Sequence, residues 1–297
     1  MRLAQALHEA TESLQATGIE DAWLEAEVLL RHTLDLDRAH LYARLQEDLS
    51  AGDQAAFHSL LARCLAREPT AYIVGRREFY GLDLETTPAA LIPRPETELL
   101  VEEVIARACP SARWACLPGR QAHHRERLLI VDVGTGNGAI AVALAVHLRQ
   151  AALVAIDLSR EALALAVRNA RRHGVEGRIS FLQADLLAPL AQPAAIIVAN
   201  LPYVSSGDWE ALPPEIREHE PRSALDGGPD GLREIERLLE QAPSCLRLGG
   251  SLLVELGPLQ AAPALALARR RFPGAAARIV PDAAGLDRLL VIDTPSP

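Results

Sequence analysis

Residues 128–140 read Leu-Leu-Ile-Val-Asp-Val-Gly-Thr-Gly-Asn-Gly-Ala-Ile. The first half of this stretch is an apolar run interrupted only by Asp132, as is typical of a strand buried on both faces. The second half places Gly134, Gly136 and Gly138 in a tight turn, which lets the backbone approach a ligand closely and directs free helix N–H groups towards it. The stretch therefore predicts the first strand, turn and helix of a doubly wound α/β domain.

Strands and helices alternate after this turn, as expected for a mostly parallel sheet covered on both sides. The further apolar runs are Leu153–Ile156, Ile179–Gln183, Ala195–Ala199, Leu252–Leu256, Arg278–Val280 and Leu289–Ile292. The helical stretches lie near 138–149, 159–173, 230–247 and 259–272. We assign residues 95–297 to this catalytic domain, and we expect a loop over 109–127.

The residues before this domain show a different pattern of apolar side chains. Residues 1–71 show apolar side chains at three- and four-residue steps, which predicts a small all-helical docking domain. Within it, Asp53 is the expected N-cap of the last helix and Pro69 its end. Residues 72–94 alternate around two glycines and predict a β-hairpin linker.

Composition excludes several classes of protein. The 297 residues carry a formal net charge of −9, which argues against a protein that mainly grips nucleic-acid phosphates. All 30 basic residues are arginine, so Schiff-base lysines and Walker-A phosphate loops are excluded. The sequence has no secretory signal and no apolar run long enough to cross a bilayer, so we expect a cytoplasmic protein without disulfides. The spacing of Cys109, Cys116, His123 and His124 matches no zinc motif, so no metal is expected.

The glycine turn alone leaves the ligand open, because G-x-G-x-x-A also fits a dinucleotide site. Asp132 would repel a pyrophosphate but attract a cationic sulfonium. Asp157 closes the next strand and is placed to accept hydrogen bonds from ribose hydroxyls, whereas Asp185 and Leu186 would lie at an adenine edge. The whole pattern resembles S-adenosylmethionine (SAM)-dependent methyltransferases. The resemblance implies a set of SAM-contacting residues: Asp132, Gly134, Thr135, Gly136, Asn137, Gly138, Asp157, Asp185, Leu186 and Asn200.

A tetrapeptide after the fourth strand of the domain, residues 200–203, indicates which chemical group the protein binds. Asn200 offers a side-chain carbonyl and the Leu201 peptide a backbone carbonyl, and two acceptors suit an NH₂ group. Pro202 stiffens the turn, and Tyr203 offers a flat face for a planar substrate group. A plain Asn-x-Pro turn is the other interpretation. Beside the glycine turn, the tetrapeptide resembles the Asn-Pro-Pro-Tyr class of amino-methyltransferases, with Leu201 in place of the first proline. Asn-Leu-Pro-Tyr also occurs in ribosomal RNA adenine dimethyltransferases.

Two longer segments distinguish between these two classes of methyltransferase. The residues 75–82 (Gly-Arg-Arg-Glu-Phe-Tyr-Gly-Leu) and 91–98 (Leu-Ile-Pro-Arg-Pro-Glu-Thr-Glu) resemble the linker of the peptide chain release factor N5-glutamine methyltransferases, the PrmC/HemK type. His219-Glu220-Pro221, Gly227 and Asp230-Gly231-Leu232 resemble the segment that follows the tetrapeptide in that family. The resemblance covers nearly the whole chain.

The family resemblance implies a Rossmann-like sheet of seven strands, the last antiparallel, preceded by a helical domain and a β-hairpin linker. It also implies methyl transfer from SAM to the glutamine amide nitrogen of the Gly-Gly-Gln motif of class I release factors, which modulates translation termination. Asn200, Leu201, Pro202 and Tyr203 would form the catalytic site. We expect a monomer that binds neither nucleic acid stably nor a membrane.

Three alternatives remain at this point. An adenine-N6 methyltransferase acting on RNA or DNA would share the tetrapeptide, although the acidic chain shows no separate base-recognition domain. An NAD-dependent oxidoreductase would share the glycine turn. A catalytically silent adaptor with the same fold would not need the tetrapeptide.

Overall fold

The computed structural model describes residues 1–108 and 128–296, which form two compact units. The helical unit comprises Met1–Arg76 together with Pro213–His219, and the sheet unit comprises the remaining described residues. The short segment 213–219 therefore groups with the first 76 residues, although it follows them far along the chain. The loop expected over 109–127, with Cys109, Cys116, His123 and His124, lies outside the described residues.

The helical unit is built from amphipathic helices whose apolar stripes face one another. Its helices are α1 (Leu3–Ala16), α2 (Ala22–Leu34), α3 (Arg38–Ala43), α4 (Ala51–Leu65), α5 (Thr70–Val74) and α9 (Pro214–Arg217). Their buried side chains, among them Leu7, Leu30 and Phe57, form one core. None of the described helices of the chain is long and apolar enough to cross a membrane.

Two details at the end of this unit differ from the sequence-based expectation. The N-cap of α4 is Ser50, whose Oγ accepts a hydrogen bond from the Asp53 N–H at 3.1 Å, so Asp53 lies in the first turn. The helix ends at Leu65, and Pro69 is the N-cap of the short helix α5. Ser50 has the extended backbone typical of an N-cap, with φ −61° and ψ 156°, whereas Asp53 already lies within the helix.

The linker forms the expected hairpin but begins later than predicted. Strands β1 (Arg76–Phe79) and β2 (Leu82–Glu85) are joined by Tyr80 and Gly81, both at positive φ, as a two-residue hairpin turn requires. The extended segment predicted from Tyr72 is wrong, because residues 70–74 form helix α5 instead. Gly75 at φ +74° ends that helix in the left-handed conformation.

The sheet unit contains all seven predicted strands. They are β3 (Leu129–Val133), β4 (Ala152–Asp157), β5 (Ile179–Gln183), β6 (Ala194–Ala199), β7 (Leu246–Glu255), β8 (Ala276–Pro281) and β9 (Asp287–Asp293). Their order is β5-β4-β3-β6-β7-β9-β8. The first five strands are parallel, whereas β9 runs antiparallel between β7 and β8. This confirms the predicted α/β fold, including its antiparallel last strand.

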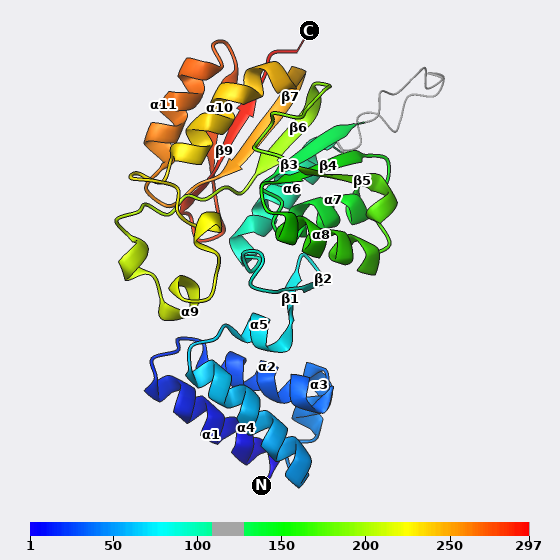
Figure 1. Ribbon diagram of the computed structural model, residues 1–297, viewed down its shortest axis with the longest axis vertical. Helices are drawn as coiled ribbons and strands as arrows, with labels where there is room; N and C mark the ends of the chain where they lie inside the picture. The colour runs from blue at the N-terminus through cyan, green and yellow to red at the C-terminus, as the bar shows by residue number, and fades with distance from the viewer. Residues whose placement is uncertain (109–127, 297) are drawn as a thin grey trace. The chain divides into compact units, whose positions relative to one another are not determined.

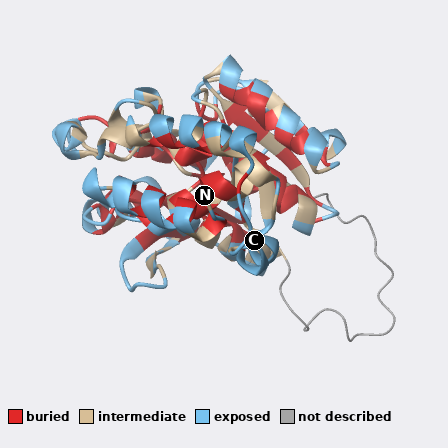
Figure 2. Cartoon of the chain, turned by 90° about the horizontal axis from the view of Figure 1, so that it is seen from below, coloured by how far each residue is buried: buried red, intermediate tan, exposed pale blue. Residues whose placement is uncertain are grey.

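Helices cover both faces of the sheet, as Figure 1 shows. α6 (Glu98–Ala108), α7 (Ala139–His147) and α8 (Arg160–Arg172) lie on one face, and α10 (Arg233–Cys245) and α11 (Ala261–Arg271) on the other. Neighbouring residues of β3 point to opposite faces of the sheet. Ile130 packs in the core beneath α6 and α7, whereas Val131 and Val133 pack in the core beneath α10 and α11. Figure 2 shows the resulting burial of the strands and of the inner sides of the helices.

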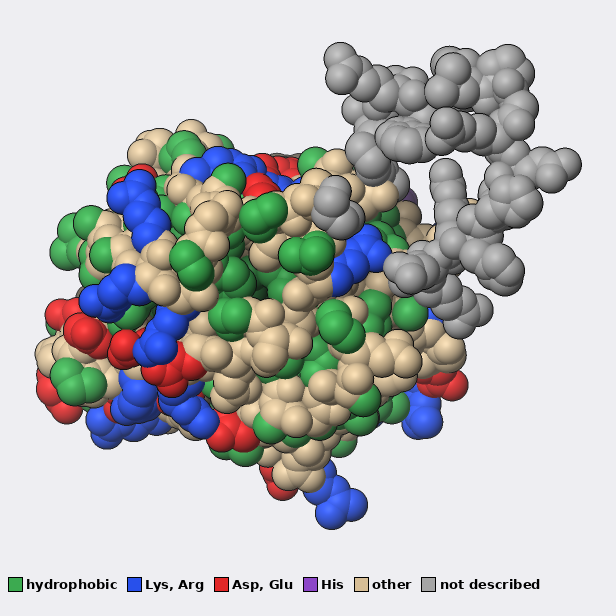
Figure 3. Space-filling view, turned by 90° about the horizontal axis from the view of Figure 1, so that it is seen from above, with side chains coloured by type: hydrophobic (Ala, Val, Ile, Leu, Met, Phe, Trp, Pro, Cys, Tyr) green, Lys and Arg blue, Asp and Glu red, His purple; other side chains and the backbone are tan. Residues whose placement is uncertain are grey.

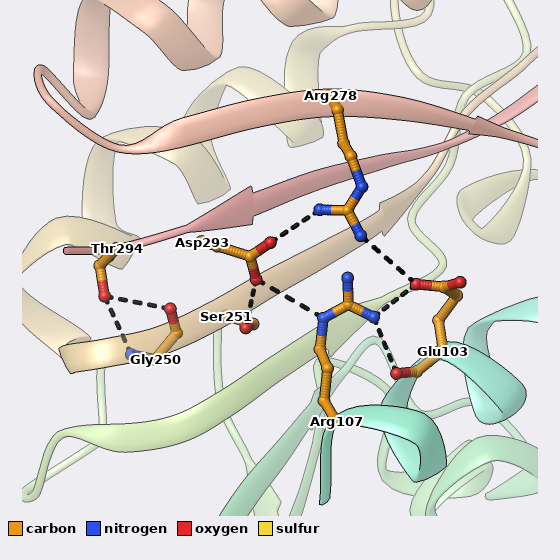
Figure 4. Close-up of polar contacts among 7 residues, drawn as sticks. All are labelled: Glu103, Arg107, Gly250, Ser251, Arg278, Asp293 and Thr294. Atoms are coloured by element: carbon orange, nitrogen blue, oxygen red, sulfur yellow. Dashed lines mark hydrogen bonds and ion pairs between the residues drawn. The ribbon is translucent and has the colours of Figure 1, made fainter. Parts of the chain in front are cut away.

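A polar cluster ties helix α6 to the antiparallel edge of the sheet (Figure 4). Asp293 of β9 accepts hydrogen bonds from Ser251 at 2.6 Å and from Arg278 at 2.7 Å, and it pairs with Arg107 of α6 at 3.5 Å. Arg107 and Arg278 also pair with Glu103. These contacts tie α6 to the sheet, and the 3₁₀ turn Pro95–Thr97 directly before α6 contributes Thr97 to the candidate site.

Candidate active site

A single cavity collects most of the residues that the sequence analysis selected. It has a volume of about 1050 Å³ and lies within the sheet unit, where strands β3, β4 and β6 end. Pockets of this size suit a small organic ligand. The predicted residues that line it are Gly134, Thr135, Gly136, Asn137, Asp157, Asp185, Leu186, Asn200, Leu201 and Pro202. Asp132, Gly138 and Tyr203 do not line it.

The glycine turn is held by the neighbouring strand β4. The N–H groups of Gly134 and Thr135 both donate to the carbonyl of Ile156, at 2.8 and 2.9 Å. The Gly136 N–H donates to Oδ2 of Asp157 at 2.8 Å. Gly138, at φ +84°, would place a Cβ only 2.9 Å from the Cβ of Ala166, so glycine is required there for helix packing and not for ligand contact.

Asp132 lies beneath this turn and does not line the cavity. Its side chain is fully buried, and its Oδ2 accepts hydrogen bonds from the Thr135 hydroxyl at 2.6 Å and from the Ala141 N–H at 3.1 Å. Burial raises the pKa of this carboxyl to about 7. The sequence analysis expected direct attraction to a cationic ligand. The side chain points instead into the loop that it organises, because the pleat of β3 turns it away from the cavity.

Asn137 and Asn169 connect the turn to the linker hairpin. Asn169 of α8 is fully buried, and its Nδ2 donates to the carbonyl of Asn137 at 2.9 Å. Its Oδ1 accepts from the N–H of Glu85 at 2.7 Å. The sequence analysis missed Asn169, because a single asparagine in a helical pattern gives no local signal. Asn137 lines the cavity, but its Nδ2 is buried and has no hydrogen-bond partner in the described part of the chain.

Two of the three acidic residues expected to contact the cofactor, Asp157 and Asp185, line the cavity. Asp157 accepts backbone N–H groups on both oxygens, from Gly136 and, at 2.8 Å, from Ser159. Burial raises the pKa of Asp157, and these hydrogen bonds act in the opposite direction. Asp185 is exposed and pairs with Arg237 of α10, with 2.5 Å between Oδ2 and Nη2.

The tetrapeptide follows β6, directly beside the glycine turn. Val133 pairs with Ala199 across β3 and β6, so Gly134 and Asn200 leave adjacent strand ends. The Asn200 Nδ2 donates to the Thr97 hydroxyl at 3.0 Å. The Tyr203 hydroxyl lies 3.5 Å from Oε1 of Glu255, and burial raises the pKa of Tyr203 to about 12. The predicted stacking face of Tyr203 therefore lies outside the cavity.

Two glycines and a glutamine support the tetrapeptide backbone from behind. A Cβ on Gly227 would lie 2.5 Å from the Pro202 carbonyl oxygen, and one on Gly231 would lie 2.1 Å from that of Tyr203. Gln260 donates from Nε2 to the Tyr203 carbonyl at 2.7 Å. The sequence analysis noted the glycines only as part of a family resemblance, and it missed Gln260.

The linker is joined to the segment after the tetrapeptide by a buried ion pair. Glu220 is 5% exposed, pairs with Arg94, and accepts from the Ile92 N–H at 3.1 Å. Arg94 lines the cavity. The sequence motif containing Glu220 therefore supports the linker that forms one wall of the cavity.

On the face shown in Figure 3, arginine side chains are interspersed with acidic ones, and the described residues there form no extended basic patch. Among the described residues, arginines pair directly with acidic side chains, as Arg271 does with Glu240 and Arg237 with Asp185. Such a mixed surface is unlike the concentrated positive charge that phosphate binding requires.

Comparisons with known proteins agree with this geometry. The model of the PrmC N-terminal domain matches residues 5–75, and that of a methyltransferase domain matches residues 130–219. A release factor glutamine methyltransferase of Moorella thermoacetica is 42% identical over 97% of both chains. One of Geobacter sulfurreducens is 44% identical over 86% of this chain and 84% of its own.

A solved methyltransferase structure from Pyrococcus furiosus, 16% identical, covers 80% of this chain and 98% of its own with a TM-score of 0.50, which shows the shared fold alone. The methyltransferase match excludes the oxidoreductase interpretation of the glycine turn. The chain belongs to the release factor glutamine methyltransferase family.

Proposed function

We propose that this protein transfers a methyl group from SAM to the side-chain amide nitrogen, N5, of the glutamine in the Gly-Gly-Gln motif of class I release factors. The observation that carries the proposal is that Asn200, Leu201 and Pro202 line the same cavity as the glycine turn. A methyl donor held by the turn would therefore lie beside the acceptor groups of the tetrapeptide. Family membership supplies the substrate class.

The cavity fits SAM by its donors and acceptors. The carboxylate of Asp157 and the backbone of the glycine turn lie in its wall, where they would meet adenosine atoms. Asp185 and Leu186 line the same wall. We assign Asp132 and Gly138 to shaping the turn, because neither lines the cavity. When bound, SAM supplies an electrophilic methyl group on a sulfonium.

The tetrapeptide addresses the chief difficulty of the reaction. An amide nitrogen is a poor nucleophile, because its lone pair is delocalised into the carbonyl. The Asn200 side-chain oxygen and the Leu201 carbonyl would accept the two N–H bonds of the substrate amide and stabilise positive charge as it develops on nitrogen. Preorganised dipoles of this kind contribute about 3–4 kcal/mol each in enzyme sites. Alignment of nitrogen with the methyl carbon contributes up to about 7–11 kcal/mol.

No general base is needed, because the nitrogen loses its proton after methyl transfer. We expect the helical unit to contact the release factor, and the protein to act as a monomer in the cytoplasm. The mixed charges of the surface in Figure 3 give no support to a nucleic-acid substrate.

Mass spectrometry of a release factor incubated with the protein and SAM tests the proposal. We expect one added methyl group on the glutamine of the Gly-Gly-Gln peptide. Asn200→Ala is expected to abolish the transfer, because it removes one of the two acceptors, while calorimetry shows SAM affinity close to that of the wild type. A release factor with asparagine in place of that glutamine serves as the substrate control.

An unmodified Gly-Gly-Gln peptide, with SAM binding intact, would refute the proposed substrate. Wild-type turnover by Asn200→Ala would refute the proposed role of the tetrapeptide while leaving the substrate assignment in place.

A further inference from the structure

Four polar side chains form a connected row behind the tetrapeptide. Asn200 donates to the Thr97 hydroxyl at 3.0 Å, and the Thr97 side chain lies close enough to the Glu255 carboxyl to lower its pKa, while Oε2 of Glu255 is buried without a hydrogen-bond partner among the described residues. The Tyr203 hydroxyl lies 3.5 Å from Oε1 of the same carboxyl. Thr97 is 4% exposed and Glu255 is fully buried. The row joins the first turn after the linker, the end of β6 and the end of β7.

The proton count of this row determines which way the Asn200 amide faces. A threonine hydroxyl has one proton to donate, whereas an ionised carboxylate can only accept. When Thr97 donates to Glu255, its oxygen has only lone pairs left for Asn200. It must then receive an N–H, so Nδ2 of Asn200 faces Thr97 and Oδ1 is the atom available to the cavity.

We propose that Thr97 and Glu255 are positioning residues that fix the orientation of the Asn200 amide, so that its oxygen and not its nitrogen meets the substrate NH₂. The identity of that substrate rests on the proposed function, but the orientation is a property of this chain alone. The opposite orientation would place an N–H donor against the donors of the substrate and would remove an acceptor needed for transfer.

Protonation of Glu255 would reverse the row. A protonated carboxyl can donate to Thr97, which can then donate to Oδ1 of Asn200 and turn the amide around. Burial raises the pKa of Glu255 to about 7, Arg288 of β9 and the Thr97 and Tyr203 hydrogen bonds act to lower it, and Glu96 raises it. Burial also raises the pKa of Tyr203 to about 12, so that side chain stays protonated at neutral pH.

Thr97→Val tests the proposal, because it keeps the shape of the side chain and removes the hydroxyl. We expect kcat to fall about tenfold to a hundredfold, since one hydrogen bond worth about 1.4 kcal/mol is a factor of ten. KM for the release factor and the affinity for SAM are expected to change less than threefold. Thr97→Ser restores the hydroxyl and is expected to recover most of the lost kcat.

The pH profile separates positioning from simple structural support. We expect wild-type kcat to rise as pH increases through about 7, as Glu255 ionises. Glu255→Gln is expected to lower kcat and abolish this rise, because its amide can no longer change charge. Glu240→Gln is the control: Glu240 is an exposed carboxyl paired with Arg271 outside the site, so the rise should persist in this variant.

The orientation can also be read without any substrate. In ¹⁵N spectra of the full-length protein, the Asn200 side-chain amide, assigned by its loss in Asn200→Asp, is expected to titrate near pH 7. The titration should vanish in Thr97→Val and Glu255→Gln. If the amide does not titrate in the wild type, or if Thr97→Val retains wild-type kcat, the proposal is wrong. If the amide titrates as expected while no release factor is methylated, the proposed substrate fails and the positioning role stands.

Discussion

Gly231 offers the sharpest test of how the tetrapeptide is supported. Its backbone has φ +73°, and a Cβ there would lie 2.1 Å from the Tyr203 carbonyl oxygen and 2.3 Å from Nε2 of Gln260. The left-handed conformation costs an alanine about 1–2 kcal/mol. Overpacking against backbone adds about 1–3 kcal/mol. We therefore expect Gly231→Ala to lower the free energy of unfolding by about 2–5 kcal/mol.

Gly174→Ala is the matched control, because Gly174 has φ +67° and no described atom within 4 Å of its Cβ position. It should lose only the conformational part, about 1–2 kcal/mol. Urea unfolding of both variants measures the difference. Gly231→Ala should also lower kcat at temperatures where it stays folded, because the displaced Tyr203 carbonyl moves the tetrapeptide. Equal losses of stability in the two variants, with kcat unchanged in Gly231→Ala, would refute the reasoning.

Two further predictions concern buried carboxyl groups. Burial raises the pKa of Asp132 to about 7, so its contribution to stability is complete below pH 4 and is lost as pH rises through 7. Between pH 4 and pH 8, the free energy of unfolding of Asp132→Asn, measured with urea, should therefore rise relative to that of the wild type by up to about 4 kcal/mol. The same pH dependence of this free energy in both proteins would contradict the prediction. Glu220→Ala leaves Arg94 without its buried partner and should cost about 3–5 kcal/mol in the same assay, against less than about 1 kcal/mol for Glu240→Ala, which breaks an exposed pair with Arg271.

Much of the fold could be predicted because most of its strands and helices depend on the pattern of residues that are close together in the sequence. Apolar runs bounded by turn residues located all seven strands of the sheet to within a few residues, except that β7 begins at Leu246, before its apolar core. The hairpin was placed too early, because the apolar residues of 70–74 suit a buried helical turn as well as a strand. A short apolar segment is compatible with either a helix or a strand, and its packing against neighbouring elements determines which one forms.

The candidate site divides in the same way. Residues on the glycine turn and in the tetrapeptide were found from sequence, because a glycine-rich turn and an Asn-x-Pro-Tyr segment are contiguous. Asp132 and Tyr203 were selected from the sequence as ligand-facing residues, but neither lines the cavity, and the direction of their side chains was not predictable. Direction at a strand end depends on the pleat and on what packs against it.

The sequence by itself determined the order of strands and helices, the glycine turn and the acceptors of the tetrapeptide, since each depends on residues close together in the chain. Only the tertiary structure decided that β3 lies beside β6, which brings Gly134 next to Asn200. It also decided that Thr97, which lies 103 residues before Asn200 in the chain, accepts a hydrogen bond from the side-chain amide of that asparagine. Contacts between residues so far apart in sequence arise from the packing of whole elements, and no local pattern records them.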